Sequence, residues 1–225
     1  MTEQIEEYLA FSDKINDYLS AIMVANEISY DQYDHNYVWD FVKNKGVSVR
    51  AFPFDGIAKE RISGMIVKDT LETTIGYNQN MTEKRKNFTI SHEIIHFLFH
   101  MDKDQTIFTD TERSLHYSYN EVLQEFQANI GASAILIPDV VLFRFLKQGW
   151  SLSQLSFTFG ISESALYVRL IQTMQANFGV SFIAAKINAD NIRYRFSGKG
   201  QHCAIELGTN LENILYKTNR FIEAL

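Results

Sequence analysis

The spacing of apolar residues along the chain predicts mostly helices. Apolar side chains recur three or four positions apart over residues 3–25 and 30–44, and Gly46 is typical of the residue just beyond a helix end. Asn120 and Pro138 are suited to begin and to end a later helix. The remaining helices are expected at residues 82–101, 120–136, 139–148 and 151–176.

Short runs of β-forming residues predict two groups of strands. "VSVRAF", "GMIV" and "TTIGYN" predict a small antiparallel sheet of three or so strands. Near the end of the chain, "VSFIAAKI", "IRYRF" and "CAIEL" are strand-like, "NADN" is a plausible turn, and a last helix is expected from about residue 209. The patterns predict an α+β protein with a helical segment over 1–44, a central domain over 45–177 and a small α+β appendage over 178–225.

Composition narrows the class of protein. The 225 residues are 46% hydrophobic and 13% aromatic, enough for a substantial core, and the single Cys203 excludes an internal disulfide framework. The acidic start "MTEQIEEYLA" is unlike a signal peptide, and no apolar run approaches the roughly 20 residues that span a bilayer. We therefore expect a cytoplasmic protein without a membrane segment.

The charge is unevenly distributed. Residues 1–40 carry nine acidic side chains and one basic one, a net charge of −8, and the remaining 185 residues carry +2. Such a chain lacks the basic surface that proteins need to bind nucleic-acid phosphates. The acidic segment is interpreted as a solvated helix face, with a docking face for a basic partner as the alternative.

The stretch "NFTISHEIIHFLFH", residues 87–100, carries the candidate chemistry. On an α-helix, residues four apart share a face and lie about 6 Å apart along the axis, so His92 and His96 can reach one metal ion. Glu93 lies beside them and can take a proton from a metal-bound water. Two buried histidines could instead be core residues, but this chain's composition produces an H-E-x-x-H pattern by chance only roughly 0.01 times.

A catalytic zinc site of this kind needs a third protein ligand. A metzincin would have a histidine at position 102, where this chain has Asp102, and a single helix can rarely bring His100 onto the same ion. On the next helix, Glu125 and Asn129 lie four apart and can supply a carboxylate ligand and a supporting polar group. Glu121, one turn earlier, is the fallback ligand. His100 is then expected to pack beside the ligands or support them.

The sequence resembles the ImmA/IrrE-like metallopeptidases over roughly residues 45–175. The pattern of that family is R-x-x-F-T-x-[AS]-H-E-x-x-H, then E-x-x-A-N and a short apolar run that ends in proline. Ile94-Ile95 stand where Leu-Gly is common, which leaves the ligands intact. The residues that match are Arg85, Phe88, Thr89, Ser91, His92, Glu93 and His96 in the first motif, and Glu125, Ala128, Asn129 and Pro138 in the second.

The resemblance implies a zincin-like fold and a cytoplasmic zinc endopeptidase of a mobile element or stress-response locus. The typical partner of such a peptidase is a helix-turn-helix transcriptional repressor, which it cleaves. The resemblance also implies that His92, His96 and Glu125 hold Zn²⁺, which is the default ion for nitrogen and oxygen ligands, and that Glu93 is the catalytic residue.

Three residues between the two motif helices are candidates, by position only, for stabilising the tetrahedral oxyanion of peptide hydrolysis: His116, Tyr117 and Tyr119.

Two other functions have some support in the sequence. "LSQLSFTFGISESALYVRL", residues 152–170, is similar to a helix-turn-helix, but its second helix offers one cation, Arg169, and DNA-reading helices normally carry more. Direct nucleic-acid binding is therefore not expected. The other alternative is a non-proteolytic anti-repressor that binds its regulator stoichiometrically. Replacing Glu93 with glutamine would separate this role from catalysis.

Overall fold

The computed structural model describes residues 3–101, 107–111, 119–194 and 198–217. The chain forms two compact units. One unit comprises Asn36–Ala132, and the other comprises the described parts of Met1–His35 and Ser133–Leu225. Helix α5, Tyr119–Leu136, contributes residues to both units.

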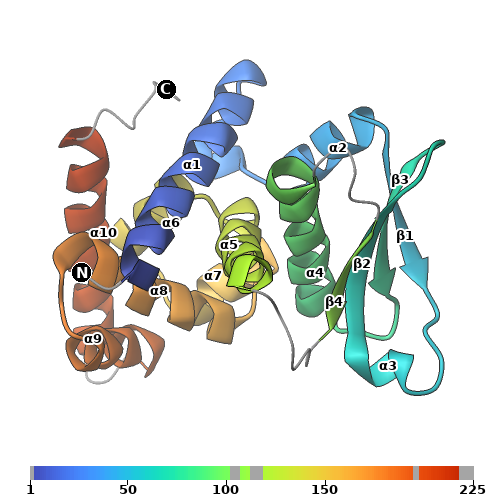
Figure 1. Ribbon diagram of the computed structural model, residues 1–225. Helices are drawn as coiled ribbons and strands as arrows, with labels where there is room; N and C mark the ends of the chain where they lie inside the picture. The colour runs from blue at the N-terminus through green and yellow to red at the C-terminus, as the bar shows by residue number, and fades with distance from the viewer. Residues whose placement is uncertain (1–2, 102–106, 112–118, 195–197, 218–225) are drawn as a thin grey trace. The chain divides into compact units, whose positions relative to one another are not determined.

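The first unit is built on a four-stranded sheet with the order β1-β3-β2-β4 (Figure 1). Its strands are β1 Val47–Phe52, β2 Ile62–Lys68, β3 Thr73–Asn78 and β4 Ile107–Thr111. The three predicted strands are present, but the expectation of a purely antiparallel sheet is wrong, because β1 pairs with β3 in parallel. Alternation of side chains predicts where strands lie, but it carries no information on their partners. Strand β4 was not predicted.

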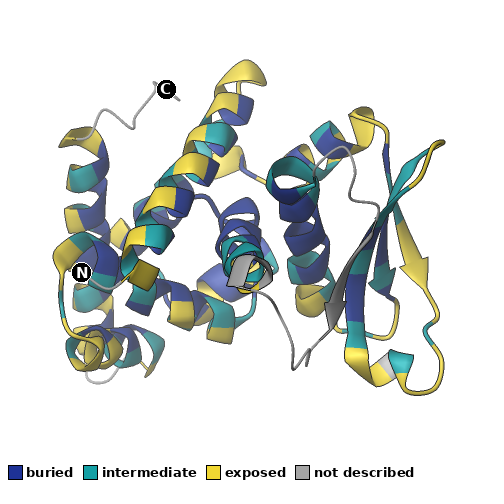
Figure 2. Cartoon of the chain, in the orientation of Figure 1, coloured by how far each residue is buried: buried dark blue, intermediate teal, exposed yellow. Residues whose placement is uncertain are grey.

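Helix α4, Glu83–Ile95, packs on β2 and β3, and its second half, residues 89–95, is buried (Figure 2). It continues into a π-helical turn, η2, His96–His100, so the helix predicted over 82–101 is confirmed with a wider last turn. Helix α2, Asn36–Asn44, contacts α4, and the Nε1–H of Trp39 donates to Oγ of Ser91 at 3.2 Å. A short helix, α3 Ala58–Arg61, precedes β2.

The second unit is helical in its described residues. Helix α1 packs against α8, and α10 packs against α6 and α9. The elements are α1 Glu3–Ala25, η1 Tyr30–Gln32, α6 Asp139–Lys147, α7 Leu152–Phe159, α8 Glu163–Phe178, α9 Phe182–Tyr194 and α10 Lys199–Lys217.

The α+β class is confirmed, but the strands predicted for 178–225 are wrong. The described residues there form α9 and α10, so "NADN" lies inside a helix and the last helix begins at Lys199. In α9, Ala185, Ala189 and Ile192 are buried at a spacing of four and three, which is the helical period. Short apolar runs satisfy both the strand and the helix period, and in this segment tertiary packing selects the helix.

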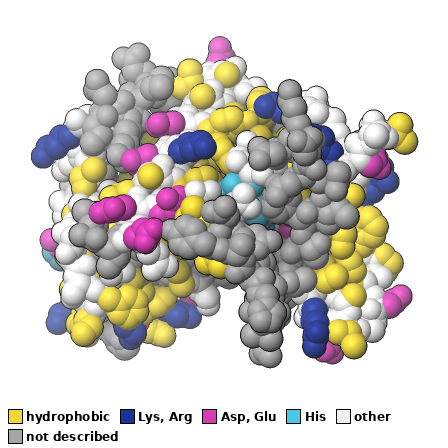
Figure 3. All heavy atoms as spheres, in the orientation of Figure 1, with side chains coloured by type: hydrophobic (Ala, Val, Ile, Leu, Met, Phe, Trp, Pro, Cys, Tyr) yellow, Lys and Arg dark blue, Asp and Glu magenta, His cyan; other side chains and the backbone are white. Residues whose placement is uncertain are grey.

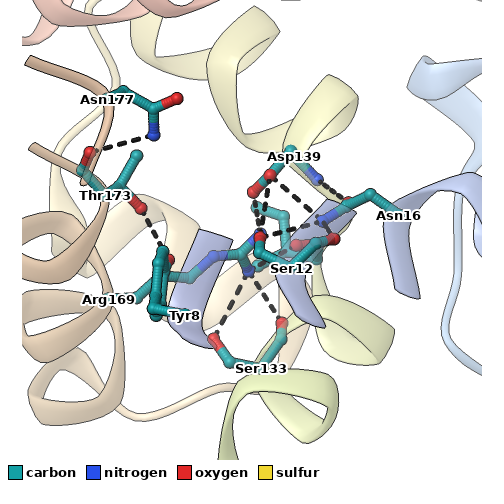
Figure 4. Close-up of polar contacts among 9 residues, drawn as sticks. Tyr8, Ser12, Asn16, Ser133, Asp139, Arg169, Thr173 and Asn177 are labelled. Carbon is teal, nitrogen blue, oxygen red and sulfur yellow. Dashed lines mark hydrogen bonds and ion pairs between the residues drawn. The ribbon is translucent and has the colours of Figure 1, made fainter. Parts of the chain in front are cut away.

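A polar cluster, buried at its centre, ties several helices of this unit together (Figure 4). The Arg169 guanidinium of α8 donates to the backbone oxygens of Ser133 and Ile137 and pairs with the Asp139 carboxylate. Asn16 of α1 donates to the same carboxylate at 3.0 Å and accepts from the Asp139 backbone N–H at 2.8 Å. Arg169 thus gives the Ser133 carbonyl a second donor beside the Ile137 backbone N–H, and it supplies a donor to the Ile137 carbonyl just beyond the end of α5.

Helices α7 and α8 do form a helix–turn–helix, with Gly160 in the left-handed conformation and Ser162 capping α8. The predicted core positions Leu155, Phe159, Ile161 and Leu166 are buried. Arg169, the single cation of α8, is only 5% exposed and forms an ion pair with Asp139. The one cation that DNA binding through this helix would have used is therefore not available to phosphates.

Acidic side chains gather on the face of the helical unit that α1 presents in Figure 3. Glu3, Glu6 and Asp17 are exposed, while Glu7 and Asp13 are partly exposed. In the described part of the chain, no single helix is long and apolar enough to cross a membrane; one bent pair, Val122–Leu136 with Asp139–Lys147, meets the criterion by length and composition only.

Tyr8 of α1 makes the stability of the protein sensitive to alkaline pH. Its hydroxyl is buried and lies 2.9 Å from Oγ1 of Thr173, and burial together with the nearby Asp139 raises the pKa of Tyr8 to about 12. The unfolded chain loses this proton near pH 10 and the folded chain does not. Stability is therefore complete below about pH 10 and falls as the pH rises toward 12, by on the order of 2–3 kcal/mol from this group.

Urea unfolding at a series of alkaline pH values measures this effect. Burial also raises the pKa of Tyr33, so the wild-type slope has more than one source. We expect Tyr8→Phe to be less stable at neutral pH, because the bond to Thr173 is lost, and to lose less stability above pH 10. Tyr216→Phe, at an exposed position, should follow the wild-type slope. An unchanged slope in Tyr8→Phe would contradict the assignment.

Candidate metal centre

Helix α4 places His92 and His96 side by side. The helix begins after Thr82; His92 lies in its buried last turn and His96 is the first residue of the π-helical turn η2, with 3% and 1% of their surface exposed. Their Nε2 atoms are 3.0 Å apart. Helical spacing thus brings two imidazole nitrogens to one point, as the motif predicted.

Glu125 of α5 completes a group of three ligand atoms. Its Oε2 lies 3.1 Å from Nε2 of His92, and its Oε1 lies 3.3 Å from Nε2 of His96. The ligand atoms of this group all lie within 4.8 Å of one another. The Glu125 side chain is 23% exposed, so the cluster reaches solvent on the carboxylate side.

These separations suit a tetrahedral metal ion. Nitrogen and oxygen ligands at 2.0–2.2 Å from zinc are themselves about 3.3–3.6 Å apart, and the observed separations of 3.0–3.3 Å are only a few tenths shorter. Three protein ligands leave one tetrahedral position for water or substrate, which is the plan of a catalytic site. The residues present therefore fit the group that the motif requires.

A close helix contact sets the approach of α5 to α4. A Cβ atom added at Gly131 would lie 2.4 Å from Cδ1 of Ile95. Glycine at this position lets the backbone of α5 pack directly on the side chain of Ile95, one residue before His96.

Glu93 lies in the same helix but is directed toward the sheet. Its side chain is fully buried, and Gly64 of β2 faces it: a Cβ atom at Gly64 would lie 2.9 Å from Oε1 of Glu93 and 2.5 Å from Cγ2 of Thr89. The absence of a side chain at Gly64 therefore leaves the space that the Glu93 carboxylate occupies.

Gly64→Ala is expected to displace Glu93 and to destabilise the protein by about 1–3 kcal/mol, the usual cost of overpacking a tight core. Denaturant unfolding measures the loss. Gly76→Ala, in the neighbouring strand, is the matched control, because its Cβ would meet mainly the ring of Phe52, which is 39% exposed and can move. Equal losses in the two variants would show that the contact with α4 has no special role.

The surroundings of the cluster favour the ionised form of the Glu125 carboxylate and the neutral form of the His100 imidazole. Burial by itself raises the pKa of Glu125, but the close contacts of its carboxylate with the His92 and His96 imidazoles outweigh it and lower that pKa to about 2. Burial, together with the neighbouring His96, lowers the pKa of His100 to about 4. At neutral pH, Glu125 is therefore anionic and His100 neutral, the forms that a metal centre uses.

The other predicted site residues fall in different places. His100 lies beside the cluster, with its Nδ1 3.0 Å from Nδ1 of His96, whereas the side chain of Asn129 is exposed. Tyr119 belongs to α5, but its side chain and that of the fallback ligand Glu121 lie outside the described residues. His116 and Tyr117 lie outside them altogether, and their predicted roles in stabilising the oxyanion stay predictions.

Three residues with direct contacts around the site were not identified from the sequence. Gly64 and Gly131 act through close packing, and Gln127 through a hydrogen bond to His100 at 2.8 Å. Gln127 lies two residues after Glu125 and within the second motif, at a position that the family pattern leaves open. No local signal distinguishes it from an ordinary helical glutamine.

Comparison with known proteins places the chain in a family. Residues 42–189, about two thirds of the chain, match the family model of the IrrE N-terminal-like domain, a peptidase family. The chain therefore belongs to this family of metallopeptidases, and the resemblance seen in its motifs is confirmed. No curated protein matches the chain in a sequence search.

Proposed function

We propose that this protein is a zinc-dependent endopeptidase. The observation that supports the proposal most directly is the convergence of two imidazole nitrogens and one carboxylate on a point that suits a tetrahedral ion. His92, His96 and Glu125 are the proposed ligands. The nitrogen and oxygen set favours zinc over harder ions such as magnesium and calcium.

In the proposed mechanism, the metal ion and the residues around it have separate roles. A zinc ion held here would supply Lewis acidity toward a peptide carbonyl and would lower the pKa of a water molecule. Glu93 is proposed to accept the proton of the attacking water and to return it to the leaving amine. Its burial and its fixed position against Gly64 limit the conformations that the carboxylate can adopt. The ionised carboxylate of Glu125 would offset part of the positive charge of the metal ion.

The proposed substrate is a helix-turn-helix transcriptional repressor, and the proposed setting is a mobile element or stress-response locus in the cytoplasm. The support for these points is the resemblance of both motifs to the ImmA/IrrE-like peptidases, together with membership of the family. A direct nucleic-acid partner is not proposed, since the only cation of α8 is buried.

Metal content of the purified protein tests the proposal. We expect about one zinc per chain in the wild type, and loss of that zinc in both His92→Ala and Glu125→Ala. Glu83→Ala, at an exposed position in the first turn of α4, is the control and should keep the metal. Absence of stoichiometric zinc in the wild type after reconstitution would mean that the histidines are structural and that the peptidase assignment is wrong.

A further inference from the structure

A chain of hydrogen bonds leads away from the proposed metal ligands and ends on α5. Nδ1 of His96 lies 3.0 Å from Nδ1 of His100, and Nε2 of His100 lies 2.8 Å from Oε1 of Gln127. Both ring nitrogens of His100 are therefore engaged by neighbours. This arrangement explains why His100, although it is on the same stripe as His92 and His96, is not among the three ligand atoms.

The chemistry of the last member determines the direction of the whole chain. An amide oxygen only accepts hydrogen bonds, so Nε2 of His100 must donate its proton to Gln127. A neutral imidazole carries one N–H, so Nδ1 of His100 must accept, and the donor is the N–H at Nδ1 of His96. Nε2 of His96 then carries no proton and presents its lone pair toward His92 and Glu125, where the ligand atoms converge.

The opposite orientation of the Gln127 amide would reverse every step. An amide N–H donating to Nε2 of His100 would place the His100 proton on Nδ1 and direct it at Nδ1 of His96. The proton of His96 would then reside on Nε2, the atom that faces the cluster, and a protonated nitrogen cannot bind a metal. The relay is thus compatible with metal binding in one orientation only.

We propose that Gln127 is a positioning residue that sets the tautomer of His96 through His100. Helix α5 then supplies two groups to one site: the Glu125 carboxylate and, two residues later, the acceptor that orients the relay. The π-helical turn His96–His100, in which the Met101 N–H bonds to the His96 carbonyl, is the local backbone feature that carries both histidines of the relay. The proposal rests on the assignment of His96 as a metal ligand.

The tautomers of His96 and His100 can be determined on the metal-free protein. Long-range ¹H–¹⁵N NMR of metal-free protein labelled at histidine distinguishes a proton on Nδ1 from one on Nε2. In the wild type we expect His96 to carry its proton on Nδ1 and His100 on Nε2. Gln127→Glu keeps an acceptor at this position and should preserve both tautomers. Gln127→Met fills the space without an acceptor and should give a mixture of tautomers.

Zinc affinity, measured by competition with a chelator, is the second readout. Gln127→Met should bind zinc about 10–100-fold more weakly than the wild type, the usual effect of losing a group that orients a metal-ligating histidine. Gln127→Glu should restore affinity to near the wild-type value. Gln124→Met, the same replacement at a partly exposed position of α5, is the control for general effects on the helix.

A proton on Nε2 of His96 in the wild type, or a Gln127→Met variant with unchanged tautomers and affinity, would overturn the proposal. Failure of the proposed function has a different signature, because zinc would then bind to none of the variants, the wild type included. The NMR measurement on metal-free protein would still decide whether the relay exists.

Discussion

Glu93→Gln is expected to lower the rate of peptide hydrolysis by about 10²–10⁴-fold while the protein still binds one zinc ion. The amide has the size of the carboxylate, so it fits the space left by Gly64, but it cannot accept the proton of an attacking water. His92, His96 and Glu125 are unchanged, and the metal should remain. The measurement is cleavage of a purified helix-turn-helix repressor, with zinc content determined on the same samples.

The same variant separates catalysis from simple binding. If the protein acts as a stoichiometric anti-repressor, Glu93→Gln should relieve repression as well as the wild type does, and the repressor should remain intact in both cases. Equal cleavage by wild type and variant would show that Glu93 is not the catalytic residue. Glu83→Gln, on the exposed first turn of the same helix, is the matched control and should cleave at the wild-type rate.

Arg169→Met is expected to destabilise the helical unit by about 3–5 kcal/mol, the usual cost of removing one partner of a buried ion pair. The guanidinium donates to two backbone carbonyls and to Asp139, and the side chain is 6% exposed. Methionine approximates its length but leaves the Asp139 carboxylate with its bonds from Ser12 and Asn16 and without a cationic partner. Denaturant unfolding followed by helical circular dichroism measures the loss.

Lys186→Met is the matched control for this experiment, because it removes the cation of another ion pair in the same unit. Lys186 pairs with Asp190 one turn away, and its side chain is 52% exposed, so the change should leave the stability nearly unchanged. Arg169→Lys keeps the charge without the planar fork and should lie between the two. A loss in Arg169→Met as small as that in Lys186→Met would show that the buried cluster is not a source of stability.

Local periodicity explains which parts of the fold were predictable. The first helix, the start of α4 after Thr82 and the end of α5 before Pro138 follow from apolar spacing and from the residues at the helix ends, which act over only a few positions. The strands β1, β2 and β3 were recognisable for the same reason. Their order and direction were not, because strand pairing joins residues that are distant in the sequence.

The segment 178–225 shows the limit of such patterns. Its apolar residues suit a strand as well as a helix, and in the structure Ala185 and Ala189 are buried as members of α9. The same limit applies to the cluster around Arg169. On α8 this residue is the only cation, and its buried partners come from elsewhere in the chain, at the end of α5 and the start of α6.

The sequence by itself determined the proposed ligand set and catalytic residue of the candidate metal centre. His92, Glu93 and His96 are recognisable because a helix converts a spacing of four into a shared face, and Glu125 because its motif follows at a characteristic separation. Only the tertiary structure decided what surrounds them. Gly64 packs against Glu93, and Gly131 packs against the side chain of Ile95. Gln127 is hydrogen-bonded to His100. Each contact forms because separate elements pack together. Contacts of this kind depend on the relative placement of whole helices and strands, which no local pattern of residues encodes.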